Sequence, residues 1–355
     1  MGFFDFITGQ RKAIAISFHD DAIRAASLAS TGNRVDIVYF AEQLLPAGVV
    51  ERSVIADSKL FQESLRALKR SCKITTPIHL LIPEDRALTF TTKVILDPTV
   101  KMEIIIEDHL KAYIALHDTV AFEDSVCEYE VTHISDNVVE VSAVIMRQSM
   151  IRNYIELFSE VGITVATCNA PSSVFAKHGT APIPNNATVI ISLQEEGSTI
   201  VVSHNGKVYQ SQYVPIGGKY LIQIIRDYVS MEYADAKKAL YKHGLLTTHP
   251  DKRVHSALSH VFRPLAEAID DMATTHLQNH SQVGAVHLYI TGSYANIPGV
   301  KEYFTRMTRL EAHDLLPHHL FANKDADDMG IPVIHLDDFL KYAPTIFCAY
   351  EYVGK

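Results

Sequence analysis

The sequence predicts a duplicated α/β fold of two lobes, with an α+β subdomain inserted between the two copies. Residues 13–28 and 188–203 repeat one pattern of apolar runs and polar turns, and a different pattern of strands and helices lies between them. A length of 355 residues exceeds that of one ordinary domain, which leaves room for two lobes and an insertion.

Each copy of the repeat predicts three strands joined by tight turns. Residues 13–18 and 188–193 are apolar, β-rich runs that contain a Ser, and a short turn with paired acids and a second strand follow each run. A further turn precedes a third strand in each copy, at residues 31–33 and at Asn205-Gly206. The Asn-Gly pair is a strong hairpin signal, because both central residues of that turn adopt positive φ.

Amphipathic helices are expected after each set of strands. Residues 58–71 place four apolar side chains on one face, and residues 219–243 repeat apolar residues at helical spacing. Three strands followed by a helix, twice in one chain, indicate a duplicated lobe.

The segment between the copies predicts the inserted subdomain. Its pattern alternates between strand and helix, and Gly162 ends its last helix. The expected strands are 78–83, 87–90, 125–129 and 138–145, and the expected helices are 102–114 and 149–161.

Composition indicates a soluble globular protein that does not bind nucleic acid. Apolar residues make up 47% of the chain, which is ample for a core. The net charge is 32 − 41 = −9, and no run of Lys or Arg is present to neutralise a phosphate backbone. The four Cys lie far apart without a CxxC pair, so we expect buried free thiols and a reducing compartment.

No membrane span or secretory signal is expected. No apolar stretch approaches the roughly 20 residues of a transmembrane helix. The start contains Phe3, Phe4 and Phe6 but lacks a basic region and a cleavage site. Two readings stay open for these Phe: they tuck into the core, which we favour, or they dip into a membrane interface.

Short motifs in a fixed order resemble the PilM family of type IV pilus assembly proteins, which are relatives of the cell-division protein FtsA in the actin/Hsp70 superfamily. Residues 289–300, for example, are similar to the family's adenosine motif s-G-G-g-a-x-l-p-G-l. Residues 343–349 resemble its closing strand and helix. The similar segments are 79–162, 214–218, 234–238, 289–300 and 343–349.

The resemblance implies an actin-like (ribonuclease H-like) fold with defined boundaries. The first lobe would comprise 11–78, completed by about 163–184 and 335–355. The insertion, of SHS2 type, would comprise 79–162. The second lobe would comprise 187–334, with its outer subdomain at about 223–283.

The family's two phosphate loops, I-D-I-G-s-s-s-x-K and D-I-G-x-x-x-T, are changed in this chain. Ser17 and Ser192 replace the Asp residues that hold magnesium-bound water. His19 and Gln194 replace the Gly residues that let backbone N–H groups approach phosphate. The matching positions are Ser17, His19 and Arg24 in the first loop and Ser192, Gln194 and Ser198 in the second.

Acidic residues beside both loops also oppose a nucleotide. If the loops keep the family geometry, Asp20, Asp21, Glu195 and Glu196 would flank a tetra-anionic ligand. Like charges a few ångströms apart cost about 1 kcal/mol each even at the dielectric constant of water, although a bound divalent cation could reverse that sign. We therefore expect degenerate or absent ATP hydrolysis and no required cofactor; ATP with magnesium is the alternative.

The positions that touch the nucleoside in the family are better kept. They are Gly217, Gly218, Asp235, Lys238, Gly292 and Ser293. Asp235 and Lys238 lie one helical turn apart, so a plain surface ion pair is an equal alternative to ligand binding. A tight turn would also explain the two adjacent Gly.

Other catalytic chemistry lacks support. There is no GxSxG, HExxH or P-loop motif, so no catalytic residue is assigned. The densest His and Asp cluster lacks the ligand spacing of a zinc site, so we expect a polar loop there and no metal. That cluster is His313, Asp314, His318, His319, Asp325, Asp327 and Asp328.

By resemblance, the chain is expected to be a scaffold on the cytoplasmic face of the inner membrane. It would bind the cytoplasmic tail of a PilN-type partner and the pilus motor ATPases, and it would associate with the membrane through its partner. Homo-oligomers are a further option. In the family, a short extended peptide lies between the first lobe and the insertion. The alternatives are an ATP-binding actin-like ATPase and an FtsA-like division filament; the latter is less expected because no amphipathic tail helix ends the sequence.

Overall fold

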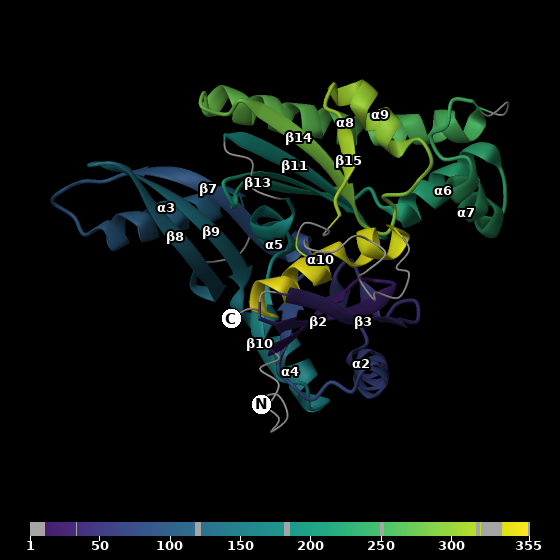
Figure 1. Ribbon diagram of the computed structural model, residues 1–355, viewed down its shortest axis with the longest axis horizontal. Coiled ribbons are helices and arrows are strands. Elements are labelled where there is room, and N and C mark those ends of the chain that lie inside the picture. Colours follow the sequence, from purple (N-terminus) through teal and green to yellow (C-terminus); the bar gives the residue numbers. More distant parts are fainter. Residues whose placement is uncertain are drawn as a thin grey trace.

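Two large β-sheets, with helices between and outside them, make up the computed structural model (Figure 1). It describes residues 11–32, 34–117, 122–180, 185–248, 252–316, 320 and 336–353. The predictions made for residues 1–7, for Asn33 and for 317–335 other than residue 320 concern residues outside these ranges.

The strand order confirms the predicted duplication. In each lobe three antiparallel strands are followed by two strands parallel to the first, and the order across the sheet is third, second, first, fourth, fifth. The first lobe contains β1 (Arg11–Phe18), β2 (Ala22–Thr31), β3 (Arg34–Leu44), β6 (Ile78–Leu81) and β10 (Val165–Asn169). The second lobe contains β11 (Asn186–Leu193), β12 (Ser198–His204), β13 (Lys207–Val214), β14 (Ala285–Thr291) and β15 (Ala312–Asp314).

The hairpin signal also behaves as predicted. Asn205 and Gly206 connect β12 to β13 with φ values of 52° and 77°. A two-residue hairpin turn of this kind has the twist of the flanking strands, which fixes their register.

Helices cover both faces of the first sheet. On the outer face, Phe61 of α2 (Ser58–Cys72) and Phe158 of α4 (Gln148–Glu160) pack with Phe18 in one core. The Asp57 side chain accepts a hydrogen bond of 2.9 Å from the Leu60 N–H, which starts α2 with an N-cap. Helix α4, which the resemblance assigns to the insertion, therefore contributes to the core of the first lobe. The hairpin of β4 (Val50–Glu51) and β5 (Val54–Ile55) adjoins this lobe.

The inner face of the first sheet meets the second lobe through α5 (Pro171–His178) and α10 (Leu336–Val353). Figure 1 shows α10, in yellow, between the two sheets. Phe175 of α5 and Phe347 of α10 are buried with Ala15 of the first sheet and Ile190 of the second. The two lobes thus share an apolar core.

Residues 343–349 do not form the expected strand and helix, because all of them lie inside α10. Pro344 has no N–H for the Leu340 carbonyl one turn earlier. That carbonyl accepts hydrogen bonds of 3.0 Å from the Thr291 hydroxyl and from the Gly292 N–H at the end of β14. The interruption in the helix ladder thereby ties α10 to the second lobe.

The second lobe is covered by α6 (Gly218–Val229), α7 (Tyr233–Lys242), α8 (Arg253–Asn279) and α9 (Val300–Thr308). The helical pattern predicted over 219–243 is two helices. Ser230 adopts a left-handed conformation, with φ of 60°, which ends α6 and turns the chain into α7.

The insertion is a three-stranded sheet with one helix. Helix α3 packs on one face of this sheet through Ile106, Leu110 and Ile114. The insertion also extends the second sheet edge to edge, because Phe90 of its first strand, β7, pairs with Gln210 of β13. Its elements are β7 (Ala87–Ile95), α3 (Met102–His117), β8 (Ser125–Ser135) and β9 (Val138–Arg147), with the short 3-10 turns η1 (Glu84–Arg86) and η2 (Phe122–Asp124) at its edges.

All four Cys are free thiols. Cys348 is buried, whereas Cys72, Cys127 and Cys168 are partly exposed. Among the described residues, no helix has the length and apolar character needed to cross a membrane.

Candidate functional site

The two altered loops meet in one small space between the lobes, which we call the interlobe cavity. Ser17 and His19 at the end of β1, and Ser192 and Gln194 at the end of β11, all line it. Its volume is about 70 Å³. The predicted nucleoside positions, such as Asp235 and Gly292, do not line it. Pockets for cofactors of nucleotide size are typically about 300–1,000 Å³, so this cavity alone is too small for one in this conformation.

In the first loop, protein groups already bond the side chains. The Ser17 hydroxyl lies 3.1 Å from the Thr345 hydroxyl of α10. Arg24, at the position of the family's loop Lys, is only 2% exposed and forms ion pairs of 2.8 Å with both Asp21 and Glu42. Its guanidinium is thus committed to two carboxylates of its own lobe.

His19 brings no positive charge to this loop. Burial, followed by the nearby Arg24 guanidinium, lowers its pKa from 6.5 to about 3. Its neutral imidazole therefore occupies the position where the family has a Gly.

The second loop is closed by its own amide side chain. Gln194 donates to the Ser192 hydroxyl over 3.1 Å and accepts from the Ser293 hydroxyl over 3.2 Å. Ser198 donates to the Ile216 carbonyl over 2.5 Å. Gln194 thus bridges the strand end at Ser192 and the 289–300 motif.

Tyr294 fills the space beside the two adjacent Gly. It is 3% exposed, and a Cβ on Gly218 would lie 1.8 Å from its ring. The ring stacks on Tyr241 at 5.9 Å, and the hydroxyl donates to the Glu195 carboxylate. The family motif has a small residue at this position, which is the sequence signal that could have revealed the filled space.

Gly292 is needed for backbone packing. It adopts φ of 99°, and a Cβ there would lie 2.2 Å from the Leu193 carbonyl oxygen.

Asp235 and Lys238 form an exposed i, i+3 ion pair of 3.1 Å on α7. The described structure thus has the ion pair that was one of the two alternatives for these residues.

Of the four acids beside the loops, two face the interlobe cavity. Asp20 and Glu196 line it from opposite lobes, whereas Asp21 pairs with Arg24 and Glu195 accepts from Tyr294. Burial, followed by repulsion from Asp20, raises the pKa of Glu196 from 4.5 to about 7.

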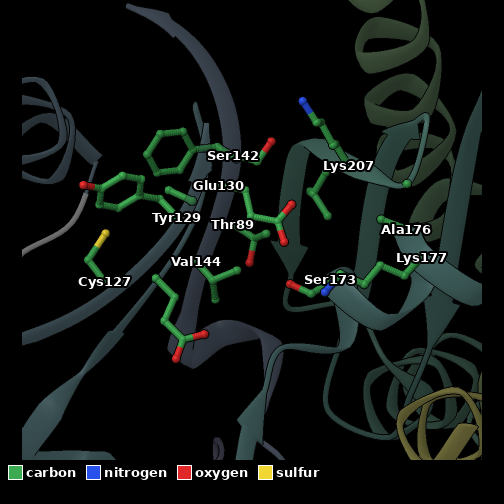
Figure 2. A pocket seen from close by; sticks show the side chains of 15 residues that line it. Thr89, Cys127, Tyr129, Glu130, Ser142, Val144, Ser173, Ala176, Lys177 and Lys207 are labelled. Atoms are coloured by element: carbon green, nitrogen blue, oxygen red, sulfur yellow. The ribbon is translucent and has the colours of Figure 1, made fainter. Parts of the chain in front are cut away.

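A second site, which no motif indicated, lies between the first lobe, the insertion and the β12–β13 turn. Two cavities of about 490 and 330 Å³ adjoin there, since Glu128 and Val144 line both. We call them together the lateral groove. Its larger, polar half is bounded by β7, β8 and β9, by α5 and by Lys207 of the β12–β13 hairpin (Figure 2).

The smaller half of the lateral groove is mainly apolar. Apolar side chains from β8, β9, α4 and β10 surround it, and Tyr352 of α10 closes one side. The apolar residues named here are Val126, Met146, Ile151, Ile155 and Val165.

No metal centre is seen in the described part of the chain, which contains no group of three His, Cys, Asp or Glu side chains arranged for an ion. Asp314 forms an ion pair of 2.7 Å with Lys301, and His313 lies 3.9 Å from Glu311. The other five members of the predicted polar loop lie outside the described residues.

The two lobes and their shared inner helices have the arrangement of an actin-like fold. No protein-family model matches the sequence, and no curated protein matches it. The structural similarity is clear.

A solved PilM-PilN type IV pilus biogenesis complex superposes with a TM-score of 0.75 at 12% identity, covering 96% of this chain and 98% of the other. Two other structures are similar to a lesser degree. The ethanolamine utilization protein EutJ of Carboxydothermus hydrogenoformans has a TM-score of 0.52 at 13% identity, covering 87% of each chain. MreB5 of Spiroplasma citri bound to ADP has a TM-score of 0.51 at 12% identity, covering 86% of this chain and 92% of that one. The two-lobed actin-like fold is thus confirmed.

Proposed function

We propose that this chain is a PilM-like scaffold of a type IV pilus assembly machine that binds the cytoplasmic tail of a PilN-type protein. The observation that carries the proposal is the fold match to the PilM-PilN complex, which spans almost the whole of both chains, insertion included. The matches to EutJ and MreB5 are looser and cover less of this chain.

The lateral groove supports this proposal. It lies between the first lobe and the insertion, where the family resemblance places an extended peptide, and it is partly apolar, with cavities of about 490 and 330 Å³. Through such a partner the chain would sit on the cytoplasmic face of the inner membrane. There it would be able to contact the pilus motor ATPases.

The interlobe cavity favours a role without ATP turnover. Gln194 bonds Ser192 and Ser293 within the protein, and Tyr294 packs over Gly218 and donates to Glu195. No cofactor is required in this proposal.

A second candidate is an ATP-binding actin-like protein, because solved MreB5 structures of similar fold are bound to AMPPNP and ADP. It would require Tyr294 and Gln194 to move away from the space that they fill. An FtsA-like filament is the third reading, and nothing in the described structure favours it over the first.

The proposal is tested with a fluorescently labelled peptide of the cytoplasmic tail of a PilN-type protein from the same bacterium. Ile155→Glu places a charge in the apolar half of the lateral groove, where Ile155 is 38% exposed, so we expect at least a tenfold loss of affinity. Ile104→Glu is the matched control, because Ile104 is 49% exposed on α3, outside the groove.

Fluorescence anisotropy measures the binding, and thermal melts establish that both variants fold. Equal affinity of the Ile155→Glu variant and the wild-type protein, or no binding by the wild-type protein, would contradict the proposal.

A further inference from the structure

The lateral groove follows the free edge of the first sheet. Five consecutive residues of β10, from Val165 to Asn169, line its apolar half. Because successive side chains of a strand point to opposite faces, five in a row means that the cavity runs along the edge of the strand. β10 is the last strand of its sheet, with β6 as its one neighbour among the described residues.

An open edge of this kind can pair with an extended peptide. Main-chain hydrogen bonds to such an edge provide affinity, and pockets beside it read alternate side chains of the peptide. Apolar side chains that point to one side would contact Met146, Ile151 and Ile155.

The polar half of the groove carries uncompensated negative charge. Its two Lys are already near carboxylates, since Lys207 lies 2.7 Å from Glu140 and Lys177 lies 3.9 Å from Glu351. Glu128 and Glu130 are exposed on β8 and form no ion pair with any residue that the structure describes. Figure 2 shows the Glu130 carboxylate pointing into this half.

We infer that the partner segment adds as a strand along β10, with apolar side chains in the apolar half and a Lys or Arg against Glu128 and Glu130. The inference rests on the proposed function and deepens it by stating the chemistry of the peptide. Glu128 lies where the two halves meet, so the basic residue would follow the apolar ones directly along the peptide.

The experiment is a positional scan of the PilN-type tail peptide in which each position is changed in turn to Lys, Gln or Glu. At 50 mM NaCl we expect one or two adjacent positions where the Lys peptide binds about tenfold tighter than the Glu peptide. In the Glu128→Lys/Glu130→Lys variant this preference should reverse, and 0.5 M NaCl should weaken it in both proteins. Glu103→Lys, an exposed acid on α3, is the matched control and should leave the preference unchanged.

The outcomes separate the two proposals. Suppose that binding depends on Ile155 but that the wild-type protein and the double variant prefer the Lys peptide over the Glu peptide equally. That result overturns this inference and leaves the proposed function standing. Absence of binding overturns both.

Strand addition has its own readout. N-methylation of alternate peptide amides should weaken binding for one set of alternate positions and not for the other, because only one set faces β10. Equal binding of both sets would overturn the pairing with β10.

Discussion

Glu196 and Asp20 approach each other from opposite lobes, at the rim of a cavity that has no Lys or Arg in its lining. Glu84 and Asp85 line the same cavity. Burial raises the pKa of both of these carboxyls, although Glu84 also accepts hydrogen bonds from Ser211 and from the Ser172 N–H. Burial between the lobes and the repulsion between ionised forms both favour protonated acids here.

This gives a pH dependence with a definite sign. The folded state raises the pKa of Glu196 from 4.5 to about 7, so it binds more protons than the unfolded state between these values. Its contribution to the free energy of unfolding is therefore present at low pH and is lost as pH rises from about 4.5 to about 7.

Glu196→Gln removes this dependence. We expect the variant to gain on the order of 1–2 kcal/mol over the wild-type protein between pH 5 and pH 8, a figure that allows for solvent screening of a partly exposed group. Urea unfolding at each pH measures the difference. Histidines such as His276, whose pKa burial lowers to about 4, affect both proteins equally and cancel. A constant difference across this range would show that Glu196 is not perturbed.

At the scale of elements, the insertion has its own apolar core but extends the second sheet through the pairing of β7 with β13. A deletion of residues 78–162 would remove β6, a central strand of the first sheet, together with α4 and its core residue Phe158. The insertion starts and ends at adjacent points, because Ala87 of β7 pairs with Met146 of β9. Residues 88–145 can therefore be replaced by a short Gly-Ser linker without removing the core residue Met146.

We expect the linker variant to keep its two lobes and to lose tail-peptide binding. It lacks β8 and most of β9 and so one wall of the lateral groove, while β10 and α4 remain. Circular dichroism and a cooperative thermal transition establish folding, and anisotropy measures binding. Retained binding by the folded variant would place the peptide elsewhere.

The elements differ in how far the sequence could predict them. The repeat and its Asn205-Gly206 turn predicted the three turn-connected strands of each lobe, because local turn chemistry and strand alternation carry that information. The break at Ser230 and the path of 343–349 through α10 were not predicted, since both depend on tertiary contacts such as those of the Leu340 carbonyl. The resemblance placed a peptide between the first lobe and the insertion, but the residues that line the lateral groove could not be predicted, because its walls come from segments that are distant in sequence.

For the whole molecule, the question is whether the two altered loops face one cavity between the lobes, as the two phosphate loops of an actin-like nucleotide site would. Ser17, His19, Ser192 and Gln194 do line one cavity, as the duplication requires. Tyr294, from a third segment, packs over Gly218 and donates to Glu195 of the second loop. In addition, the Ser17–Thr345 contact and the bonds to the Leu340 carbonyl link α10 to both lobes.

We therefore expect nucleotide binding when the four loop residues are restored and the Tyr294 ring is removed together. Either change alone should not restore it. Two changes, Ser17→Asp and Ser192→Asp, supply carboxylates that can bond magnesium-bound water. The changes His19→Gly and Gln194→Gly remove two side chains from the loops, and Tyr294→Ala removes a third. We expect magnesium-dependent heat of ATP binding in calorimetry for the fivefold variant, but not for the four loop changes alone or for Tyr294→Ala alone. The wild-type protein should show neither binding heat nor ATP turnover.

Each Gly substitution costs about 0.5–1 kcal/mol in chain entropy, so a thermal melt must establish folding first. If the fivefold variant unfolds, Gln194→Gly with Tyr294→Ala provides the milder test, by thermal shift with ATP and magnesium. A folded fivefold variant without binding heat would show that something other than these side chains excludes the nucleotide. ATP turnover by the wild-type protein that Gln194→Gly abolishes would instead favour a working ATPase over the scaffold.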